Sequence, residues 1–330
     1  MDYFPLFMHV QGAECLVVGG GEVAARKAAT LLRAGALVHV VAPELAQGMQ
    51  DVLHEASAKH SARGYRTSDL DRVWLVIAAT DDRELNARVS RDARERRVPV
   101  NVVDDPELCT FIMPAIVDRS PLVVAISSTG ASPVLARLAR GKLEAALPAR
   151  YGPLARLCSA LRSEVRERLP DLQQRRRFWE TALEGTVAEL VFAGRDADAE
   201  QALRQLLVEF EHAPPPRGEV FLVGVGPNDP ELVSFRALRA MERADLVLAS
   251  ARVSEAILDL CRRDAARERF VDFSPEVMPL VALRASAAAR AGSRVCVLGV
   301  GDAFRSSTGD ELRARLTAAG LHSQLVPGVA

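Results

Sequence analysis

A triple glycine, Gly19-Gly20-Gly21, is the first feature of the chain whose residue type and spacing point to chemistry. With Ala24 it satisfies the pattern G-x-G-x-x-G/A, between a predicted strand at residues 15–18 and a predicted helix at residues 22–33. Glycine lets the backbone approach a pyrophosphate, and the helix N-terminus offers free N–H groups to it. In this setting the pattern predicts a dinucleotide site, whereas a triple glycine by itself would predict only a tight turn.

Candidate cofactor contacts lie at the helix start and after the second predicted strand, at residues 37–41. We expect Glu22 and Val23 to contribute beside the glycines Gly19 and Gly21. Pro43 and Glu44 follow the second strand, where a carboxylate commonly accepts the ribose hydroxyls and favours NAD over NADP. Glu44 has a second interpretation, as a residue that begins the next helix.

Thr80 and Asp81 follow a further predicted strand, at residues 73–78. The carboxyl edge of an open α/β sheet is where ligands bind, so both are candidates for the cofactor side of the site. Their other interpretation is capping of a helix that begins near Arg83, and the two roles are compatible.

The elements that must position these residues form an α/β pattern. Near-continuous apolar strands are predicted at residues 15–18, 37–41, 73–78 and 98–103, with helical stretches between them. Strands of this kind belong to a parallel sheet that is covered on both faces. We therefore predict an N-terminal Rossmann-type parallel sheet, with Gly35 ending its first helix in a left-handed conformation.

After residue 113 the predicted pattern changes from alternating strands and helices to one further strand followed by helices. Another apolar strand is predicted at residues 122–126, and a hydroxyl-rich loop leads from it to a helix at residues 134–147 that Ser132 caps. Residues 151–211 have helical spacing without a strand signal, which predicts a small helical domain. Within it, the arginine-rich stretch at residues 173–179 is interpreted as a solvated helix face, because glutamates follow it.

A proline-rich linker at residues 212–218 precedes a second α/β unit. Its predicted strands lie at residues 220–223, 246–248 and 295–298, with glycine loops after the first and the last. The chain ends without a terminal helix, which predicts a domain that is only partly present.

Composition excludes several classes of protein. The net charge is −1 and aromatic residues make up 5%, so nucleic acid is not an expected partner. No apolar run approaches the ~20 residues of a membrane span, and no signal peptide is evident. The five cysteines are far apart and the histidines lack ligand spacing, so neither disulfides nor a resident metal is predicted. A cytoplasmic location is expected.

Six motifs together resemble the siroheme synthase family, in particular its precorrin-2 dehydrogenase and sirohydrochlorin ferrochelatase module. They occur at residues 19–24, 78–82, 101–104, 111–114, 118–121 and 132–137. The resemblance runs in register to about Arg217, and the remainder resembles the start of a uroporphyrinogen-III methyltransferase domain.

The resemblance implies two reactions in one cleft. NAD+ takes a hydride from precorrin-2 to give sirohydrochlorin, and ferrous iron, a substrate, then replaces the pyrrole protons to give siroheme. Asp104 occupies the family's catalytic aspartate position, where a carboxylate would accept protons in both steps. Without the resemblance, Asp104-Asp105-Pro106 would be interpreted as turn chemistry.

Other residues take roles from the same resemblance. Asn101 is expected to orient the substrate, and Ser128 and Thr129 to contact its carboxylates through a loop that leads into a helix N-terminus. In the family, residues corresponding to 114–147 form a dimer interface and the partner chain completes the cleft, so a homodimer is expected.

The C-terminal part departs from the methyltransferase pattern. The family's tyrosine-aspartate-arginine sequence is replaced by Ala249-Ser250-Ala251, and its glycine-lysine-arginine sequence by Asp272-Phe273-Ser274. Asn228 stands where glycine is usual, and Arg305-Ser306-Ser307 replaces an aromatic-glycine-arginine run. We therefore expect neither S-adenosylmethionine binding nor methyltransferase activity.

The predicted organisation has four parts. They are a NAD-binding Rossmann domain at residues 1–113, a dimerisation region at 114–150, a helical domain at 151–215 and a partial tetrapyrrole methylase-like domain at 216–330. The favoured function is a bifunctional dehydrogenase and ferrochelatase in siroheme biosynthesis. The alternatives are a dehydrogenase alone, or a non-catalytic protein that binds tetrapyrroles.

Overall fold

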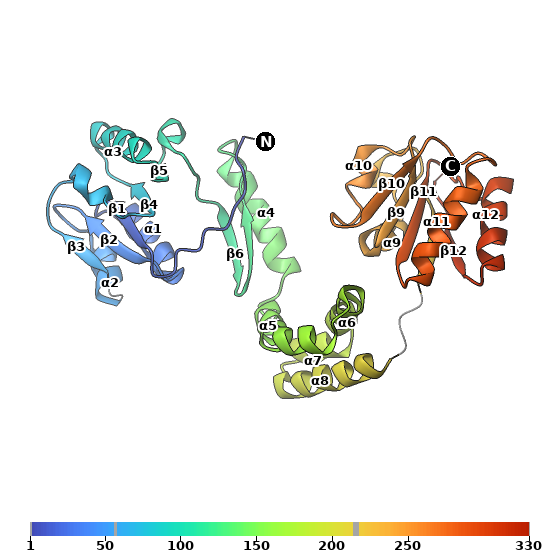
Figure 1. Cartoon of the computed structure of the whole chain (residues 1–330). Coiled ribbons are helices and arrows are strands. Elements are labelled where there is room, and N and C mark those ends of the chain that lie inside the picture. Colours follow the sequence, from blue (N-terminus) through green and yellow to red (C-terminus); the bar gives the residue numbers. More distant parts are fainter. Residues whose placement is uncertain (1, 56–57, 214–217, 330) are drawn as a thin grey trace. The chain divides into compact units, whose positions relative to one another are not determined.

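The computed structural model describes residues 2–55, 58–213 and 218–329, which form two compact units, Met1–Ala155 and Arg156–Ala330 (Figure 1). The predicted linker falls largely on residues 214–217, outside the described residues. Each unit contains one five-stranded parallel sheet. The predicted α/β class is confirmed for both.

The first sheet has the strand order β3-β2-β1-β4-β5. Its strands are β1 (Glu14–Val18), β2 (Leu37–Val41), β3 (Lys59–Ser61), β4 (Leu75–Ala78) and β5 (Val100–Val102). The order reverses between β1 and β4, which is where such sheets bind ligands at their carboxyl edge. Sequence reasoning missed β3, because its three residues, Lys-His-Ser, lack an apolar pattern.

Helices cover both faces of this sheet. On one face α1 (Glu22–Arg33) and α2 (Gln47–Glu55) bury alternate strand residues, such as Val17 and Val40. On the other face α3 (Arg83–Glu95), with the 3-10 turn η1 (Thr67–Leu70), buries the intervening residues, such as Leu16 and Val76. Gly35 follows α1 with φ +80°, so the predicted left-handed cap is confirmed.

A separate two-stranded antiparallel hairpin follows the 3-10 turn η2 (Pro106–Leu108). It pairs β6 (Ala115–Arg119) with β7 (Leu122–Ile126), the strand predicted at those residues. The helix α4 (Pro133–Ala146) comes next, and Ser132 caps it as predicted by accepting the Leu135 N–H over 3.2 Å.

In the described part of the chain, four helices follow α4 and precede the second sheet. They are α5 (Tyr151–Arg168), α6 (Leu172–Glu184), α7 (Thr186–Phe192) and α8 (Asp196–His212). Phe178, Leu203 and Leu207 are among their fully buried side chains. The helical character predicted for residues 151–211 is confirmed.

The second sheet has the order β10-β9-β11-β8-β12. Its strands are β8 (Glu219–Gly224), β9 (Leu246–Ser250), β10 (Ala266–Phe270), β11 (Arg294–Gly299) and β12 (Ser323–Val326). One face packs on α9 (Phe235–Arg243) and α10 (Glu255–Leu258), and the other on α11 (Met278–Arg290) and α12 (Ser307–Ala318). The strands that sequence reasoning missed, β10 and β12, are the two polar edge strands.

Candidate functional site

The three glycines after β1 serve different purposes. Gly19 has φ +124°, and a Cβ there would overlap the Ala79 carbonyl at the end of β4. A Cβ at Gly20 would overlap the Glu44 carbonyl after β2. A Cβ at Gly21 would meet nothing within 4 Å. The first two glycines therefore let the loops close together, and the third leaves open space in front of α1.

The N-terminus of α1 is suited to an anion. Gly21 is its N-cap residue, and among the described residues no side chain caps it. The helix dipole and free N–H groups are thus available to a phosphate group that fills the open space. Glu22 faces away toward α2, where its Oε1 accepts the Gly48 N–H over 3.1 Å. The site fits the pyrophosphate of a dinucleotide.

A cavity of about 300 Å³ opens at the same edge of the sheet, beside the start of α1. It brings together four predicted site residues, Val23, Thr80, Asp81 and Asp104. Val23 comes from α1, Thr80 and Asp81 follow β4, and Asp104 follows β5. The strand order thus places residues that are far apart in the sequence around one space.

Asp104 is held in an uncommon backbone conformation. Its φ is +60°, in the left-handed region that few non-glycine residues adopt, although aspartate is one of the more tolerant types. Such conformations persist only where surrounding contacts impose them, and they cluster at active sites. The turn interpretation and the site interpretation are both consistent with this geometry, because the turn presents Asp104 to the cavity.

Thr80 and Asp81 do not cap the following helix. Asp82 caps α3 by accepting the N–H groups of Glu84 and Leu85, over 2.9 and 3.0 Å. The capping alternative for Thr80 and Asp81 is therefore corrected to the neighbouring aspartate. Thr80 instead donates its hydroxyl to Asn86 Oδ1 over 2.8 Å, at the cavity wall.

The remaining cofactor candidates, Pro43 and Glu44, lie in the loop that follows β2. Pro43 and Glu44 are exposed after β2 and do not line the described cavity. Since α2 begins only at Gln47, Glu44 is not the first residue of a helix. Glu44 lies in the loop between β2 and α2, where it is exposed to solvent.

The residues predicted to contact the substrate do not line the cavity that Asp104 lines. Asn101 is 7% exposed, and its Nδ2 donates to the Phe111 carbonyl over 3.1 Å, so it holds a loop from inside. Ser128 and Thr129 lie between β7 and α4 and do not line the cavity. Thr129 has φ +53°, the same left-handed conformation as Asp104.

Two residues near Asp104 were missed by sequence reasoning. Lys27 is half-buried on α1, one turn after Val23. Burial and Arg26 lower the pKa of Lys27, while the charge of Asp104 opposes this. The sequence did offer a signal for Lys27, because it lies four residues after Val23 and therefore on the same face of α1. Cys109 contacts the loop that carries Asp104, and nothing in its spacing indicated this.

The glycine loops of the second unit pack against each other. Gly226 and Gly301 exchange two backbone hydrogen bonds of 2.7 and 3.2 Å. A Cβ at Gly224 would come within 2.6 Å of the Gly301 carbonyl, and one at Gly328 would overlap it. Asn228 has φ +68°, and its Nδ2 donates to the Arg252 carbonyl over 2.8 Å. Close backbone packing accounts for Gly224 and Gly328, whereas Gly301, where a Cβ would meet nothing within 4 Å, is accounted for by its φ of +70°.

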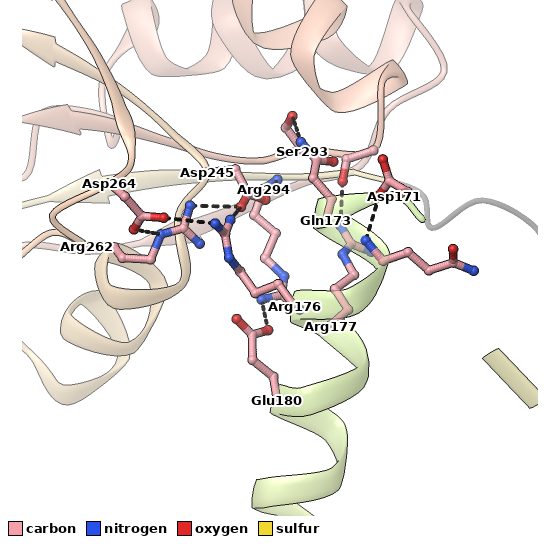
Figure 2. Close-up of polar contacts among 12 residues, drawn as sticks. Asp171, Gln173, Arg176, Arg177, Glu180, Asp245, Arg262, Asp264, Ser293 and Arg294 are labelled. Carbon is pink, nitrogen blue, oxygen red and sulfur yellow. Dashed lines mark hydrogen bonds and ion pairs between the residues drawn. The ribbon is translucent and has the colours of Figure 1, made fainter. Parts of the chain in front are cut away.

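The arginine-rich stretch is not a solvated helix face, and that interpretation is corrected. Figure 2 shows Arg176 on α6 pointing at two carboxylates of the same unit, Asp245 and Asp264, with N–O distances of 2.7 and 2.9 Å. Arg177 donates to the Gly292 carbonyl over 2.6 Å. Local spacing could not reveal these partners, because they lie more than 60 residues away.

The carboxylate at the centre of this network is Asp245, whose side chain is 11% exposed. It also accepts the backbone N–H of Arg294 over 2.9 Å and pairs with Arg262 over 3.1 Å. Burial acts to raise the pKa of Asp245, but these donors and Arg176 outweigh it and hold the pKa below its usual value.

Neither a metal cluster nor a membrane-spanning helix occurs in the described part of the chain. In residues 2–55, 58–213 and 218–329 there is no group of three or more His, Cys, Asp or Glu side chains that could hold a metal ion. None of the helices in those residues is long and apolar enough to cross a bilayer.

Three family models match the chain. One described as putative NAD(P)-binding covers residues 6–115, one for a sirohaem synthase dimerisation region covers 150–207, and one for tetrapyrrole (corrin/porphyrin) methylases covers 219–330. The dimerisation model falls on the segment predicted as the helical domain.

Similar proteins extend over the whole chain. It is 48% identical over 333 residues to a siroheme synthase of Azotobacter vinelandii, and 50% identical over 334 residues to one of Pseudomonas paraeruginosa. Each alignment covers 100% of this chain and 71% of the relative. Among solved structures, SirC, a precorrin-2 dehydrogenase, is 20% identical with a TM-score of 0.49, covering 63% of this chain and 100% of that one.

Proposed function

The chain belongs to the siroheme synthase family, and from this premise we propose that its first unit oxidises precorrin-2 to sirohydrochlorin with NAD+. The NAD(P)-binding region of the family is present at residues 6–115. The observation that carries the proposal is the cavity in which Val23, at the start of α1, meets Asp104. A cofactor held at Gly21 and a substrate held at Asp104 would share that space.

NAD+, when bound, supplies the hydride acceptor. Gly19 and Gly21 would admit its pyrophosphate to the N-terminus of α1. Thr80 and Asp81 would line the nicotinamide side, since both reach the cavity. Glu44 would accept the ribose hydroxyls, and its charge would repel the extra phosphate of NADP. The exposed position of Glu44 after β2 supports this preference.

Asp104 is the proposed catalytic residue. Oxidation of precorrin-2 removes a hydride and a proton from the macrocycle, and a carboxylate at the cavity wall can accept that proton. Insertion of ferrous iron, as the second substrate, releases two pyrrole protons, for which the same carboxylate is an acceptor. The left-handed backbone of Asp104 supports a functional role, because such strain is usually retained where a site requires it.

Substrate carboxylates would be met by the loop between β7 and α4. Ser128 donates its hydroxyl to the Ser132 carbonyl over 2.9 Å, and Thr129 is exposed. The adjoining helix α4 exposes Val134, Leu135 and Leu138, and none of its residues is buried. We propose that a second copy of the chain covers this apolar face and completes the substrate cleft, so the working form would be a homodimer.

Methyltransferase activity is proposed to be absent. Ala249 and Ala251 flank the end of β9, where the family's expected aspartate would stand. The glycines Gly224 and Gly301 persist, but close backbone packing at Gly224 and a positive φ of +70° at Gly301 account for them without a cofactor. Isothermal titration with S-adenosylmethionine is expected to give no binding at micromolar concentrations, and a micromolar dissociation constant would refute this part of the proposal.

One assay tests the dehydrogenase and the ferrochelatase in turn. The protein is incubated with precorrin-2 and NAD+, NADH and the macrocycle spectrum are followed, and ferrous iron is then added. NADH followed by siroheme is the expected result. Absence of NADH would refute the dehydrogenase and leave tetrapyrrole binding as the function, whereas sirohydrochlorin without siroheme would restrict the protein to the first step.

A further inference from the structure

The loop that follows β5 is folded around a single thiol. The Val102 N–H donates to Cys109 Sγ over 3.1 Å, and Sγ lies 3.2 Å from the Val102 carbonyl and 3.3 Å from that of Asp105. Asn101 Nδ2 approaches the same sulfur at 3.6 Å. Asp104 lies between these anchor points, so the thiol ties together the residues on either side of it.

This loop must maintain an unfavourable conformation. Asp104 has φ +60°, which a residue with a Cβ does not retain unless its surroundings impose it. The η2 turn closes the far side of the loop through a 3.1 Å hydrogen bond from the Cys109 N–H to the Pro106 carbonyl. The backbone and the side chain of Cys109 therefore act on the same short segment.

The thiol has the hydrogen-bonding capacity for this role. Cys109 is half-buried, and burial raises the pKa of its thiol, so the S–H is retained near neutral pH. A protonated thiol can accept an N–H and donate to one carbonyl at the same time. A serine hydroxyl could do both, a valine side chain fills similar space but can do neither, and alanine leaves the space empty.

The thiol itself is not placed to react with a ligand. In this loop, Asp104 and Asp105 line the cavity, whereas Cys109 does not. Among the described residues, the polar contacts of the thiol are to Asn101, Val102 and Asp105. This arrangement separates Cys109 from the reacting groups and couples it to the residue that presents one.

We propose that Cys109 is a positioning residue for Asp104: its thiol holds the β5–η2 loop in the shape that directs the Asp104 carboxylate into the cavity. This inference rests on the proposed function of Asp104 in the reaction. It adds a residue that acts through another and does not contact the substrate.

The kinetic test compares Cys109→Ser, Cys109→Val and Cys109→Ala in the full chain, with Cys158→Ala as the matched control. We expect Cys109→Val and Cys109→Ala to lower kcat for NADH formation from precorrin-2 by about 10- to 100-fold, the scale of a catalytic group displaced by about 1 Å. KM for NAD+ should remain near the wild-type value, because the glycine loop is untouched. Cys109→Ser should recover most of kcat, and Cys158→Ala, on α5, should resemble wild type.

A second test does not depend on activity. Hydrogen–deuterium exchange should accelerate at Val102 in Cys109→Val, since its N–H loses the sulfur acceptor. Val100, whose N–H donates to Thr110 Oγ1 over 2.8 Å, is the internal reference and should stay protected. The NMR chemical shifts of Asp104 should lose their left-handed signature in the same variant.

The outcomes separate this inference from the proposed function. Unchanged exchange at Val102 and unchanged Asp104 shifts would refute the inference, and so would faster exchange with an unchanged kcat. Activity lost in Cys109→Ser as fully as in Cys109→Val would also refute it. If wild type formed no NADH, the proposed function would fall, and the exchange and shift data would still decide whether Cys109 fixes the loop.

Discussion

The two parallel sheets of this chain each have a glycine loop after their first strand, yet the loops face different surroundings. After β1, Gly21 leaves open space before an uncapped helix N-terminus. After β8, Gly224 and Gly226 lie against the backbone of Gly301. For the loops after the first strand of each sheet, the space beside the glycine therefore distinguishes a candidate cofactor site from close packing between loops.

The loops also differ in the polar residues around them. The first sheet edge brings the carboxylates Asp81 and Asp104 to one cavity. At the second edge, Asn228 joins two loops through Arg252, and Asp302 Oδ1 accepts the Gly328 N–H over 3.4 Å. The side chains of the first edge are available to a ligand, and those of the second hold neighbouring loops together.

The largest expected difference between the two regions concerns Asp104. Asp104→Asn should lower the rate of NADH formation by about 10²- to 10⁴-fold, the usual loss on removing a general base. Asparagine also tolerates positive φ, so the thermal unfolding temperature should stay near that of wild type. Steady-state kinetics and calorimetry measure both quantities.

The matched control for Asp104→Asn is Asp302→Asn in the loop after β11 of the second sheet, which should leave NADH formation unchanged. If the two variants lost equal activity, or if Asp104→Asn kept the wild-type rate, the proposed contrast between the two sheets would be wrong.

Alanine at individual glycines should separate positions of close backbone packing from positions with open space. Gly20→Ala and Gly328→Ala place a Cβ against backbone, and each should lower the free energy of unfolding by about 3 kcal/mol. Gly21→Ala meets only open space, so it should leave stability nearly unchanged and weaken NAD+ binding. Denaturant unfolding and NAD+ titration check this, and a strongly destabilised Gly21→Ala would contradict it.

The ion network around Asp245 in the second unit should contribute less to the free energy of unfolding than the closely packed glycines do. Asp245→Asn should lower the free energy of unfolding by about 2 kcal/mol, because Arg176 and Arg262 lose a largely buried partner. The pKa of Asp245 is held below its usual value, so its contribution is complete above the unfolded pKa of about 4 and is lost as the pH falls through the folded value.

Urea unfolding at pH 7 and at pH 3 measures that contribution: the gap between wild type and Asp245→Asn should narrow at the lower pH. The control is Arg204→Gln, which breaks exposed pairs and should cost about 0.5 kcal/mol or less. A gap independent of pH would show that the carboxylate charge of Asp245 is not the cause.

The smallest expected effect is on cofactor choice. Glu44→Gln should raise KM for NAD+ by about fivefold, equivalent to about 1 kcal/mol or one ordinary hydrogen bond, and should reduce the preference over NADP+. Ratios of kcat/KM for the two cofactors measure this. An unchanged ratio would remove Glu44 from the ribose site and leave the glycine loop as the basis of NAD(P) binding.

Local patterns determined much of the fold. Apolar runs placed β1, β2 and β7, and the capping chemistry of Ser132 and Gly35 fixed helix ends, because these signals depend on neighbours in the sequence. Short or polar edge strands such as β3 and β10 were missed, since they bury too little apolar surface to leave a pattern.

For the site, the sequence by itself determined which residues follow which strands, and therefore that Val23, Thr80 and Asp104 could share one sheet edge. Only the tertiary structure decided their surroundings: that Asn101 turns inward, that a thiol organises the loop around Asp104, and that Arg176 meets Asp245. The physical reason is distance along the chain. The position of a strand along the chain follows from local periodicity, but the partner of a buried polar group is chosen by packing between segments that the sequence keeps apart.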